Sequence, residues 1–203
     1  SQVRFFNQAQ RWVELDKHPN VVGAYYVQNI CGAPRLFVEY VIHGKTLDVF
    51  MSSHREELEI ELILDIAIQI SWGMKHAHGK GLLHGDLRPA NIFITEEGEA
   101  KIADFRSREG IHMEYTPYMP PEQFDKDRPV EPYVDIYSFG MILYELCTGE
   151  LPFKVPKRIE GEEALQNFHN ILLTQPPLPP HKVEPKIPVS LSETIMRCLS
   201  LEP

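Results

Sequence analysis

Cysteine is scarce in this sequence. Only three of the 203 residues are cysteines, Cys31, Cys147 and Cys198, and they lie far apart with no paired spacing. This pattern offers neither a disulfide framework nor the spacing of a cysteine-based zinc site. Few, unpaired cysteines are typical of a reducing compartment, so we expect a cytoplasmic protein.

Long apolar runs and an excess of basic residues are also missing. No segment reaches the roughly 20 apolar residues that a membrane-spanning helix needs, and no signal-peptide pattern is present, so we expect no membrane insertion. Twenty Lys and Arg stand against 29 Asp and Glu, a net charge of -9, which argues against a nucleic-acid partner. The hydrophobic content of 43% suffices for one substantial core.

The most informative part of the chain is residues 84–91, HGDLRPAN, followed by residues 103–105, ADF. These two runs place Asp86, Asn91 and Asp104 within nineteen residues. Carboxylate and amide oxygens at this density suit phosphoryl transfer, because Mg²⁺ prefers oxygen ligands and a carboxylate can accept a proton. The alternative for Asp86 is an ordinary loop aspartate that bonds its own backbone.

A β-hairpin is predicted to bring two of these side chains together. Residues 91–95 and 100–104 are short β-type runs, and the turn between them contains Gly98. If this turn is centred between residues 97 and 98, facing residue numbers sum to 195, and Asn91 lies opposite Asp104. Facing side chains start only ~5 Å apart at Cβ, so the two are predicted to share a Mg²⁺ that also binds substrate phosphates.

These runs resemble the catalytic loop and metal-binding hairpin of eukaryotic-type protein kinases, whose patterns read H-R-D-x-K-x-x-N and D-F-G. Further landmarks of that family follow in register, and their wording is most similar to prokaryotic Ser/Thr kinases. They are HPNVV at residues 18–22, LFVEYV at 36–41, PPE at 120–122 and DIYSFG at 135–140.

The resemblance implies a role for each site residue. Asp86 would be the catalytic carboxylate, and Arg88, in place of the family's Lys, would be a cation for the transferring phosphate, unless it is a solvated surface residue. Asn91 and Asp104 would hold Mg²⁺. Backbone groups of Glu39 and Val41 would hold the adenine of ATP and Val38 would line its pocket, unless this segment is an ordinary buried strand end. His84 is expected to be structural rather than chemical. A protein substrate or regulatory partner is implied.

The predicted elements describe an α+β fold of the protein-kinase type. Residues 21–30 and 35–42 are expected to form a hairpin around Cys31 and Gly32. Residues 1–41 would then be a remnant of the small lobe, and 42–203 an incomplete large lobe. On that reading the glycine-rich strands are missing, and Glu122 lacks its usual Arg partner. Helices are predicted over residues 3–16, 58–80, 133–148, 161–173 and 190–199, the last with a serine cap at Ser190.

Three departures from the family pattern leave two functions open. Gln8 stands where the family has a Glu that forms an ion pair, Gly85 replaces an Arg, and Arg106 replaces the Gly after Asp104 and Phe105. The chain is therefore either an active Ser/Thr protein kinase or a catalytically impaired pseudokinase that acts as a binding or regulatory module. The proline-rich residues 176–180 are either a polyproline docking ligand or a plain connecting loop.

Overall fold

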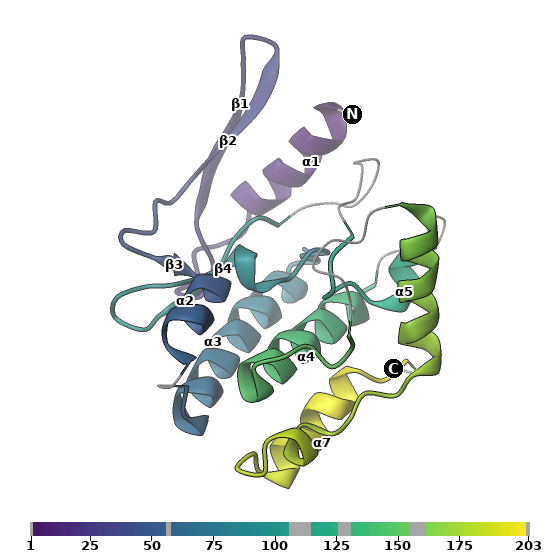
Figure 1. Ribbon diagram of the computed structural model, residues 1–203. Helices are drawn as coiled ribbons and strands as arrows, with labels where there is room; N and C mark the ends of the chain where they lie inside the picture. The colour runs from purple at the N-terminus through teal and green to yellow at the C-terminus, as the bar shows by residue number, and fades with distance from the viewer. Residues whose placement is uncertain (1, 56–57, 106–114, 126–130, 155–160, 202–203) are drawn as a thin grey trace. The chain divides into compact units, whose positions relative to one another are not determined.

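The computed structural model describes residues 2–55, 58–105, 115–125, 131–154 and 161–201 (Figure 1). The chain divides into two compact units. Unit 1 combines residues 1–54 with 64–112, and unit 2 combines residues 55–63 with 113–203. Among the described residues, no helix is both long and apolar enough to cross a membrane.

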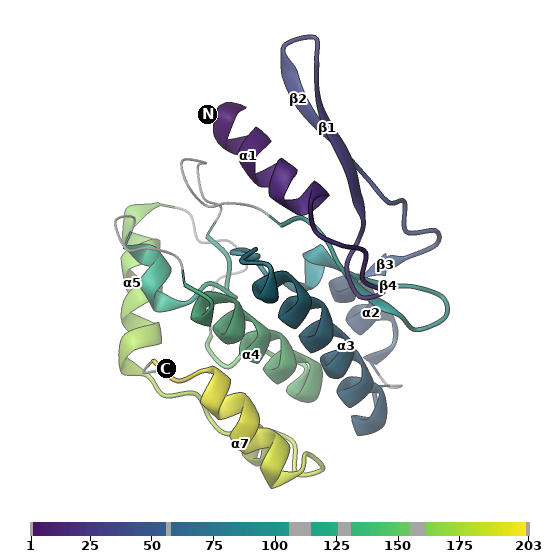
Figure 2. The same ribbon diagram turned by 180° about the vertical axis from the view of Figure 1, so that it is seen from behind.

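Unit 1 contains a helix beside a β-hairpin. The helix α1 (Gln2–Val13) lies along the strands β1 (Ala24–Ile30) and β2 (Ala33–Val38), as two opposite views show (Figures 1 and 2). The antiparallel register pairs Ile30 with Ala33, so Cys31 and Gly32 form a two-residue turn. Both turn residues have positive φ, as a type I′ hairpin turn requires. The predicted hairpin is confirmed, with shorter strands.

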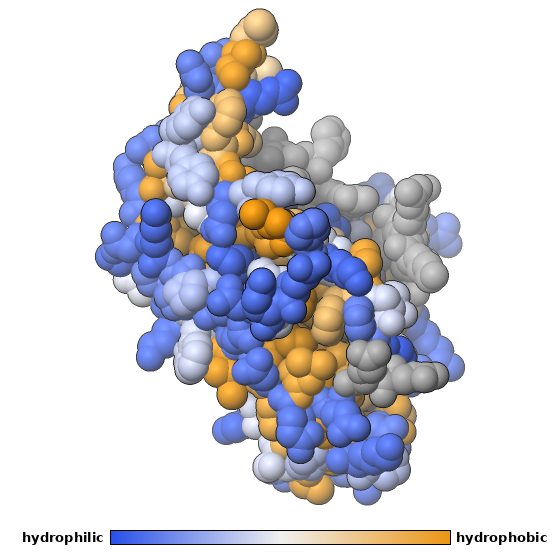
Figure 3. Space-filling view, turned by 90° about the vertical axis from the view of Figure 1, so that its left-hand side faces the viewer, coloured by the Kyte–Doolittle hydropathy of each residue, from blue (hydrophilic) through white to orange (hydrophobic). Residues whose placement is uncertain are grey.

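The surface of this hairpin carries several large apolar and aromatic side chains. Figure 3 shows hydrophobic residues interspersed with hydrophilic ones on this face of the molecule. The exposed large apolar and aromatic side chains contributed by the two strands are Tyr25, Tyr26, Ile30 and Val38. Tyr26 stacks on Phe37 of the neighbouring strand, with ring centroids 4.4 Å apart, so part of this aromatic surface is covered by cross-strand packing.

The rest of unit 1 carries a second, three-stranded sheet and most of the long helix α3. The sheet order is β3-β4-β5, with antiparallel neighbours. Its strands are β3 (Lys45–Thr46), β4 (Ile92–Ile94) and β5 (Ala100–Ile102). The helices are α2 (Leu47–Ser53), the 3₁₀ turn η2 (Pro89–Asn91) and α3 (Ile60–Gly79), which begins in unit 2. Along α3, Ile66, Ile70, Met74 and Ala77 are buried at helical spacing.

The register predicted for the β4–β5 hairpin is wrong by one residue. Ile92 pairs with Ile102 and Ile94 with Ala100, so facing numbers sum to 194 and Asn91 lies opposite Ala103 rather than Asp104. Thr95 N–H donates to Glu99 O, which leaves a three-residue loop centred on residue 97. Gly98 ends that loop at a φ of 82°, the left-handed position that three-residue hairpin loops place last.

Unit 2 is helical in its described part. It contains η3 (Pro121–Phe124), α4 (Tyr133–Thr148), α5 (Glu162–Thr174), α6 (Pro180–Val183) and α7 (Val189–Cys198). The predicted bounds of α4 are confirmed, and α4 packs against α7. The serine cap predicted for the last helix is wrong: Pro188 is the N-cap residue and makes no side-chain cap bond, because the helix begins one residue before Ser190.

Candidate active site

All seven residues that the sequence singled out lie in unit 1, on three segments. Asp86, Arg88 and Asn91 belong to the loop that ends in η2, Asp104 follows β5, and Val38, Glu39 and Val41 lie at and after the end of β2. The placement of these residues can therefore be compared within one compact unit.

The loop before β4 holds Asp86 and Asn91 in direct contact. The Asn91 amide Nδ2 donates to the Asp86 carbonyl at 2.8 Å and reaches the Asp86 carboxylate at 3.4 Å. Asn91 is only 6% exposed, so its side chain has a fixed direction. Because Nδ2 is used within the loop, the amide oxygen of Asn91 is the atom that faces elsewhere, and an amide oxygen is a ligand that Mg²⁺ accepts.

Arg88 lies beside the carboxylate of Asp86. Its Nε is 3.6 Å from Asp86 Oδ2, and the two side chains are 26% and 18% exposed. That Nε is buried and has no hydrogen-bond partner among the described residues. Arg88 is therefore not a fully solvated surface residue. It is a partly buried cation next to the proposed catalytic carboxylate, where its positive charge would stabilise a negatively charged phosphate.

His84 joins the predicted catalytic loop to the end of β5. Its Nδ1 accepts from the Asp86 backbone N–H at 3.2 Å, and its Nε2 lies 2.9 Å from the carbonyl oxygen of Ala103. Since a backbone N–H can only donate, Nδ1 must be unprotonated and Nε2 must carry the hydrogen. The ring is fully buried, so the structural role predicted for His84 is confirmed.

The residues after β5 are held by aromatic packing. Phe105 is 3% exposed, and its ring lies 4.9 Å from His84 and 5.4 Å from Trp12 of α1, centroid to centroid. Asp104, between Ala103 and Phe105, has a φ of 65°, a left-handed conformation that non-glycine residues rarely adopt. Both neighbours of Asp104 are thus fixed while its own backbone is strained, a combination found at functional sites.

The segment between β2 and β3 contains the residues predicted to meet adenine. Val38 is 40% exposed at the end of β2. Glu39 N–H donates to the Gly23 carbonyl at 2.7 Å, so the backbone group that Glu39 can offer to a ligand is its carbonyl oxygen. The carbonyl of Val41 accepts from Gly44 N–H at 3.2 Å, which fixes the following turn.

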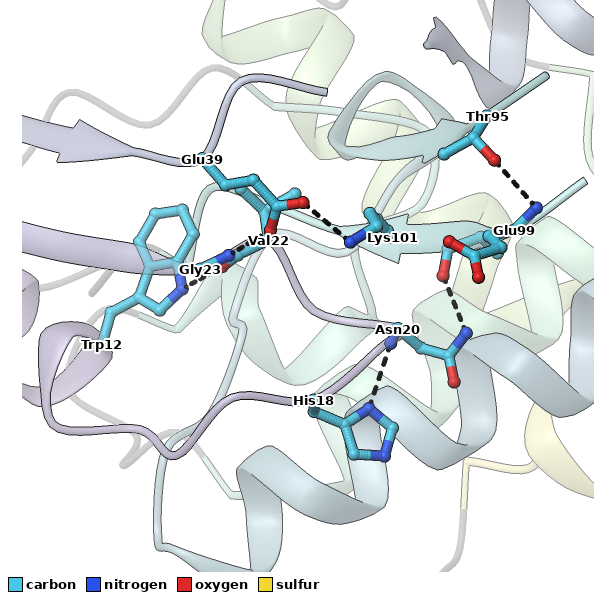
Figure 4. Close-up of polar contacts among 10 residues, drawn as sticks. Trp12, His18, Asn20, Val22, Gly23, Glu39, Thr95, Glu99 and Lys101 are labelled. Carbon is cyan, nitrogen blue, oxygen red and sulfur yellow. Dashed lines mark hydrogen bonds and ion pairs between the residues drawn. The ribbon is translucent and has the colours of Figure 1, made fainter. Parts of the chain in front are cut away.

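Asn20 supports β5 from the side opposite β4 (Figure 4). Its carbonyl accepts from Ile102 N–H, and its side-chain Nδ2 donates to Ala100 O and to Gln69 Oε1, both at 3.0 Å. Val22 N–H donates to Ile102 O, and the Val22 carbonyl accepts from the Trp12 indole at 3.0 Å. The strand that leads to Asp104 is thereby bonded along both edges.

The described part of the chain contains no metal site built from His, Cys, Asp and Glu side chains alone. No group of three or more His, Cys, Asp or Glu side chains there is placed to hold a metal. The donor set of Asn91 and Asp104 still fits Mg²⁺, because this ion is usually bound through one or two protein oxygens together with water and substrate phosphates. The joint Asn91–Asp104 site stays a prediction, now with Ala103 as the facing residue of Asn91.

Two of the three departures from the kinase pattern lie on described residues. Gln8 is half-buried on α1, and Gly85 precedes Asp86 in the catalytic loop. Arg106 lies outside the described residues.

A separate pocket of about 580 Å³ lies in unit 2, and none of the seven site residues lines it. Its wall combines Glu122 of η3, Tyr137 of α4, Leu173 of α5 and Arg197 of α7. Burial, and secondarily the negative charge of Glu122, raise the pKa of Tyr137 well above its usual value. This pocket is not part of the candidate active site.

Comparison with known proteins identifies the class that these motifs define. The family described as protein tyrosine and serine/threonine kinase matches residues 1–203. A probable serine/threonine-protein kinase of Clostridium acetobutylicum is 30% identical over 91% of this chain and 28% of its own length. A serine/threonine-protein kinase of Myxococcus xanthus is 30% identical over 99% of this chain and 29% of its own length. A serine/threonine/tyrosine-protein kinase of Arabidopsis thaliana is 31% identical over 92% and 47%.

The chain belongs to the protein kinase family, and its α+β fold is that of a kinase domain. It spans less than a third of the length of the two bacterial relatives. Sequence reasoning missed one prominent interaction, the ion pair between Glu39 and Lys101, which are 62 residues apart in the chain. The only signal for it in the sequence was the opposite charge of the two residues.

Proposed function

We propose that this domain transfers the γ-phosphoryl group of Mg-ATP to a Ser or Thr hydroxyl of a cytoplasmic protein substrate. The observation that carries the proposal is a set of hydrogen bonds that connects Asp86 with Asn91 and with the residue before Asp104. Asn91 bonds Asp86, and His84 bonds both Asp86 N–H and the carbonyl of Ala103, the residue before Asp104. Relatives named as serine/threonine-protein kinases support the substrate class.

Asp86 would act on the acceptor hydroxyl. Its carboxylate orients the Ser or Thr O–H and accepts that proton as the hydroxyl oxygen forms its bond to the γ-phosphorus and the bond to the β–γ bridging oxygen breaks. The leaving group is ADP. Arg88, whose Nε lies 3.6 Å from Asp86, places positive charge beside the transferring group. Positioning and charge stabilisation supply most of the rate in this reaction class.

Asn91 and Asp104 would hold Mg²⁺ on the nucleotide phosphates, where the ion neutralises phosphate charge. At the other end of the nucleotide, the carbonyl of Glu39 and the backbone of Val41 would meet the adenine edge, and Val38 would line its pocket. In this proposal residues 1–41 correspond to small-lobe elements and residues 42–203 to the large lobe.

A catalytically impaired pseudokinase that binds a regulatory partner is the second candidate. It is favoured by Gln8: a neutral amide on α1 cannot form the ion pair that the kinase pattern places there. The two candidates differ in phosphoryl transfer and agree on the fold.

The test is phosphate transfer from Mg-ATP to Ser- and Thr-containing peptides by the full-length protein and its Asp86→Asn variant. We expect transfer by the wild type and a loss of ~10²–10⁴-fold in turnover for the variant, with nucleotide affinity nearly unchanged, because the carboxylate acts on the hydroxyl. Glu96→Gln, the same carboxylate-to-amide change in the exposed β4–β5 loop, should be silent. A wild-type protein that binds Mg-ATP without transferring phosphate would establish the pseudokinase alternative.

A further inference from the structure

The side chain of Glu39 has no part in the phosphoryl-transfer scheme, yet both of its carboxylate oxygens accept hydrogen bonds. Its Oε1 accepts from Lys101 Nζ at 2.8 Å, and its Oε2 accepts from Gly23 N–H at 3.0 Å (Figure 4). The backbone N–H of the same residue donates to Gly23 O. Glu39 therefore makes three hydrogen bonds, one to Lys101 of β5 and two to Gly23.

The bond between Glu39 and Lys101 connects two segments that lead to opposite ends of the proposed nucleotide site. Lys101 lies in β5, three residues before Asp104, the proposed metal ligand. Glu39 itself belongs to the segment proposed to meet adenine. Gly23 follows Val22, which is bonded to Ile102 of β5 through Val22 N–H, so the third point returns to the same strand.

The Glu39–Lys101 pair is more buried than an ordinary surface ion pair, so it can hold its two segments in a fixed geometry. The side chain of Lys101 is 15% exposed and that of Glu39 is 30% exposed, whereas the surface pair Lys80–Asp16, at 2.7 Å, has side chains that are 54% and 71% exposed. Less solvent screens the Glu39–Lys101 pair, and both carboxylate oxygens have fixed donors. Burial opposes ionisation of Glu39, but the hydrogen bonds from Lys101 and Gly23 outweigh it and lower the pKa of Glu39, so the carboxylate is charged at neutral pH.

We infer that the Glu39 carboxylate and Lys101 are positioning residues, which hold the adenine-binding backbone of residues 39–41 at a fixed place relative to the strand that carries Asp104. The inference rests on the proposed function, since it assigns a task to the same nucleotide site. Without the pair, the Glu39 backbone would remain bonded to Gly23, but its direct side-chain link to β5 would be lost. A nucleotide would then have to order both segments itself, at a cost in affinity.

The experiment compares Lys101→Met, Glu39→Gln and the double variant in the full-length protein. Binding of adenosine and of Mg-ADP is measured by calorimetry, and KM for ATP and kcat are measured where transfer occurs. We expect each single variant to bind adenosine at least about five-fold more weakly, with KM raised and kcat changed less. The double variant should be no worse than either single variant, because both remove one interaction. Lys101→Arg should restore most of the affinity.

Adenosine is the decisive ligand because it carries no phosphate and no metal. A loss confined to Mg-ADP would assign Lys101 to the phosphate end and overturn the inference. Lys80→Met is the matched control, since it breaks the exposed Lys80–Asp16 pair in the same unit and should leave adenosine affinity unchanged. A folding defect alone would lower the melting temperature of the variants without changing the affinity of the folded protein, and that result also overturns the inference.

The outcomes separate this inference from the proposed function. A wild-type protein that binds adenosine but transfers no phosphate refutes the proposed activity, and the affinity comparison still decides the role of the pair. Unchanged or tighter adenosine binding in both single variants overturns the positioning role while leaving the kinase activity intact. A wild-type protein that binds neither ligand overturns both.

Discussion

Replacement of Gly73 by alanine would force a methyl group into the contact between α3 and the segment that supports β5. A Cβ built on Gly73 lies 2.6 Å from the carbonyl oxygen of Asn20 and 2.9 Å from Cδ1 of Ile102. Non-bonded heavy atoms prefer separations of about 3.5 Å or more. The backbone of Asn20 would therefore have to move by about 1 Å to relieve the clash.

Asn20 is poorly able to make that movement. Its carbonyl accepts from Ile102 N–H at 2.9 Å, and its side chain donates to Gln69 and to Ala100 O. Overpacking of this kind costs about 1–3 kcal/mol, and the better helix propensity of alanine returns at most about 1 kcal/mol. We expect a net loss of about 1–2 kcal/mol in the free energy of unfolding, which lowers the melting temperature by about 2–8 °C for a chain of this size.

Gly79 of the same helix provides the matched control. No atom lies within 4 Å of a Cβ built there, so Gly79→Ala should be neutral or should stabilise by up to about 1 kcal/mol. Urea denaturation followed by far-ultraviolet circular dichroism measures both variants against the wild type. If Gly73→Ala proves as stable as Gly79→Ala, the close approach of α3 to Asn20 does not exist in solution.

Three further predictions concern single side chains. Tyr137→Phe should leave stability unchanged or raise it by up to about 1 kcal/mol in urea denaturation, because the buried hydroxyl has no partner among the described residues; a clear loss would reveal one. Trp12→Phe should cost about 1–3 kcal/mol through the lost indole bond to the Val22 carbonyl, whereas Trp72→Phe, at a 57% exposed position, should stay within about 0.5 kcal/mol. The Glu39–Lys101 pair should stabilise the folded protein fully above the unfolded carboxyl pKa of about 4.3. This contribution is lost as the pH falls through the lowered pKa of Glu39 in the folded state. The difference in free energy of unfolding between wild type and Lys101→Met, measured against pH, should therefore vanish at low pH.

The elements that sequence reasoning predicted well are those defined by local signals. The bounds of α4 followed from a buried apolar run ended by Gly149, and the β1–β2 turn at Cys31 and Gly32 followed from glycine chemistry between two β-type runs. Such signals act within a few residues, so they are readable without any knowledge of tertiary contacts.

The errors arose where one residue of offset decides the outcome. From the sequence, the turn between β4 and β5 can be centred on residue 97 or between residues 97 and 98. The hydrogen bond from Thr95 N–H to Glu99 O corresponds to the first of these two registers. Ser190 is a good capping residue, but the helix begins earlier because Pro188 takes the N-cap position. The Glu39–Lys101 pair was beyond prediction for a different reason: its partners meet only after the β1–β2 hairpin and β5 have been assembled around Asn20.

The double bonding of β5 determines where the chain near Asp104 can move. Ile102 pairs with Ile92 on one edge, while on the other its N–H donates to Asn20 and its carbonyl accepts from Val22. Exchange of the Ile102 and Val22 amide hydrogens with solvent therefore requires opening of several segments at once, so these amides should be among the slowest to exchange in unit 1. Any displacement of Asp104 on a faster timescale must then come from rotation of the backbone between Ala103 and Phe105, with β5 itself remaining in place.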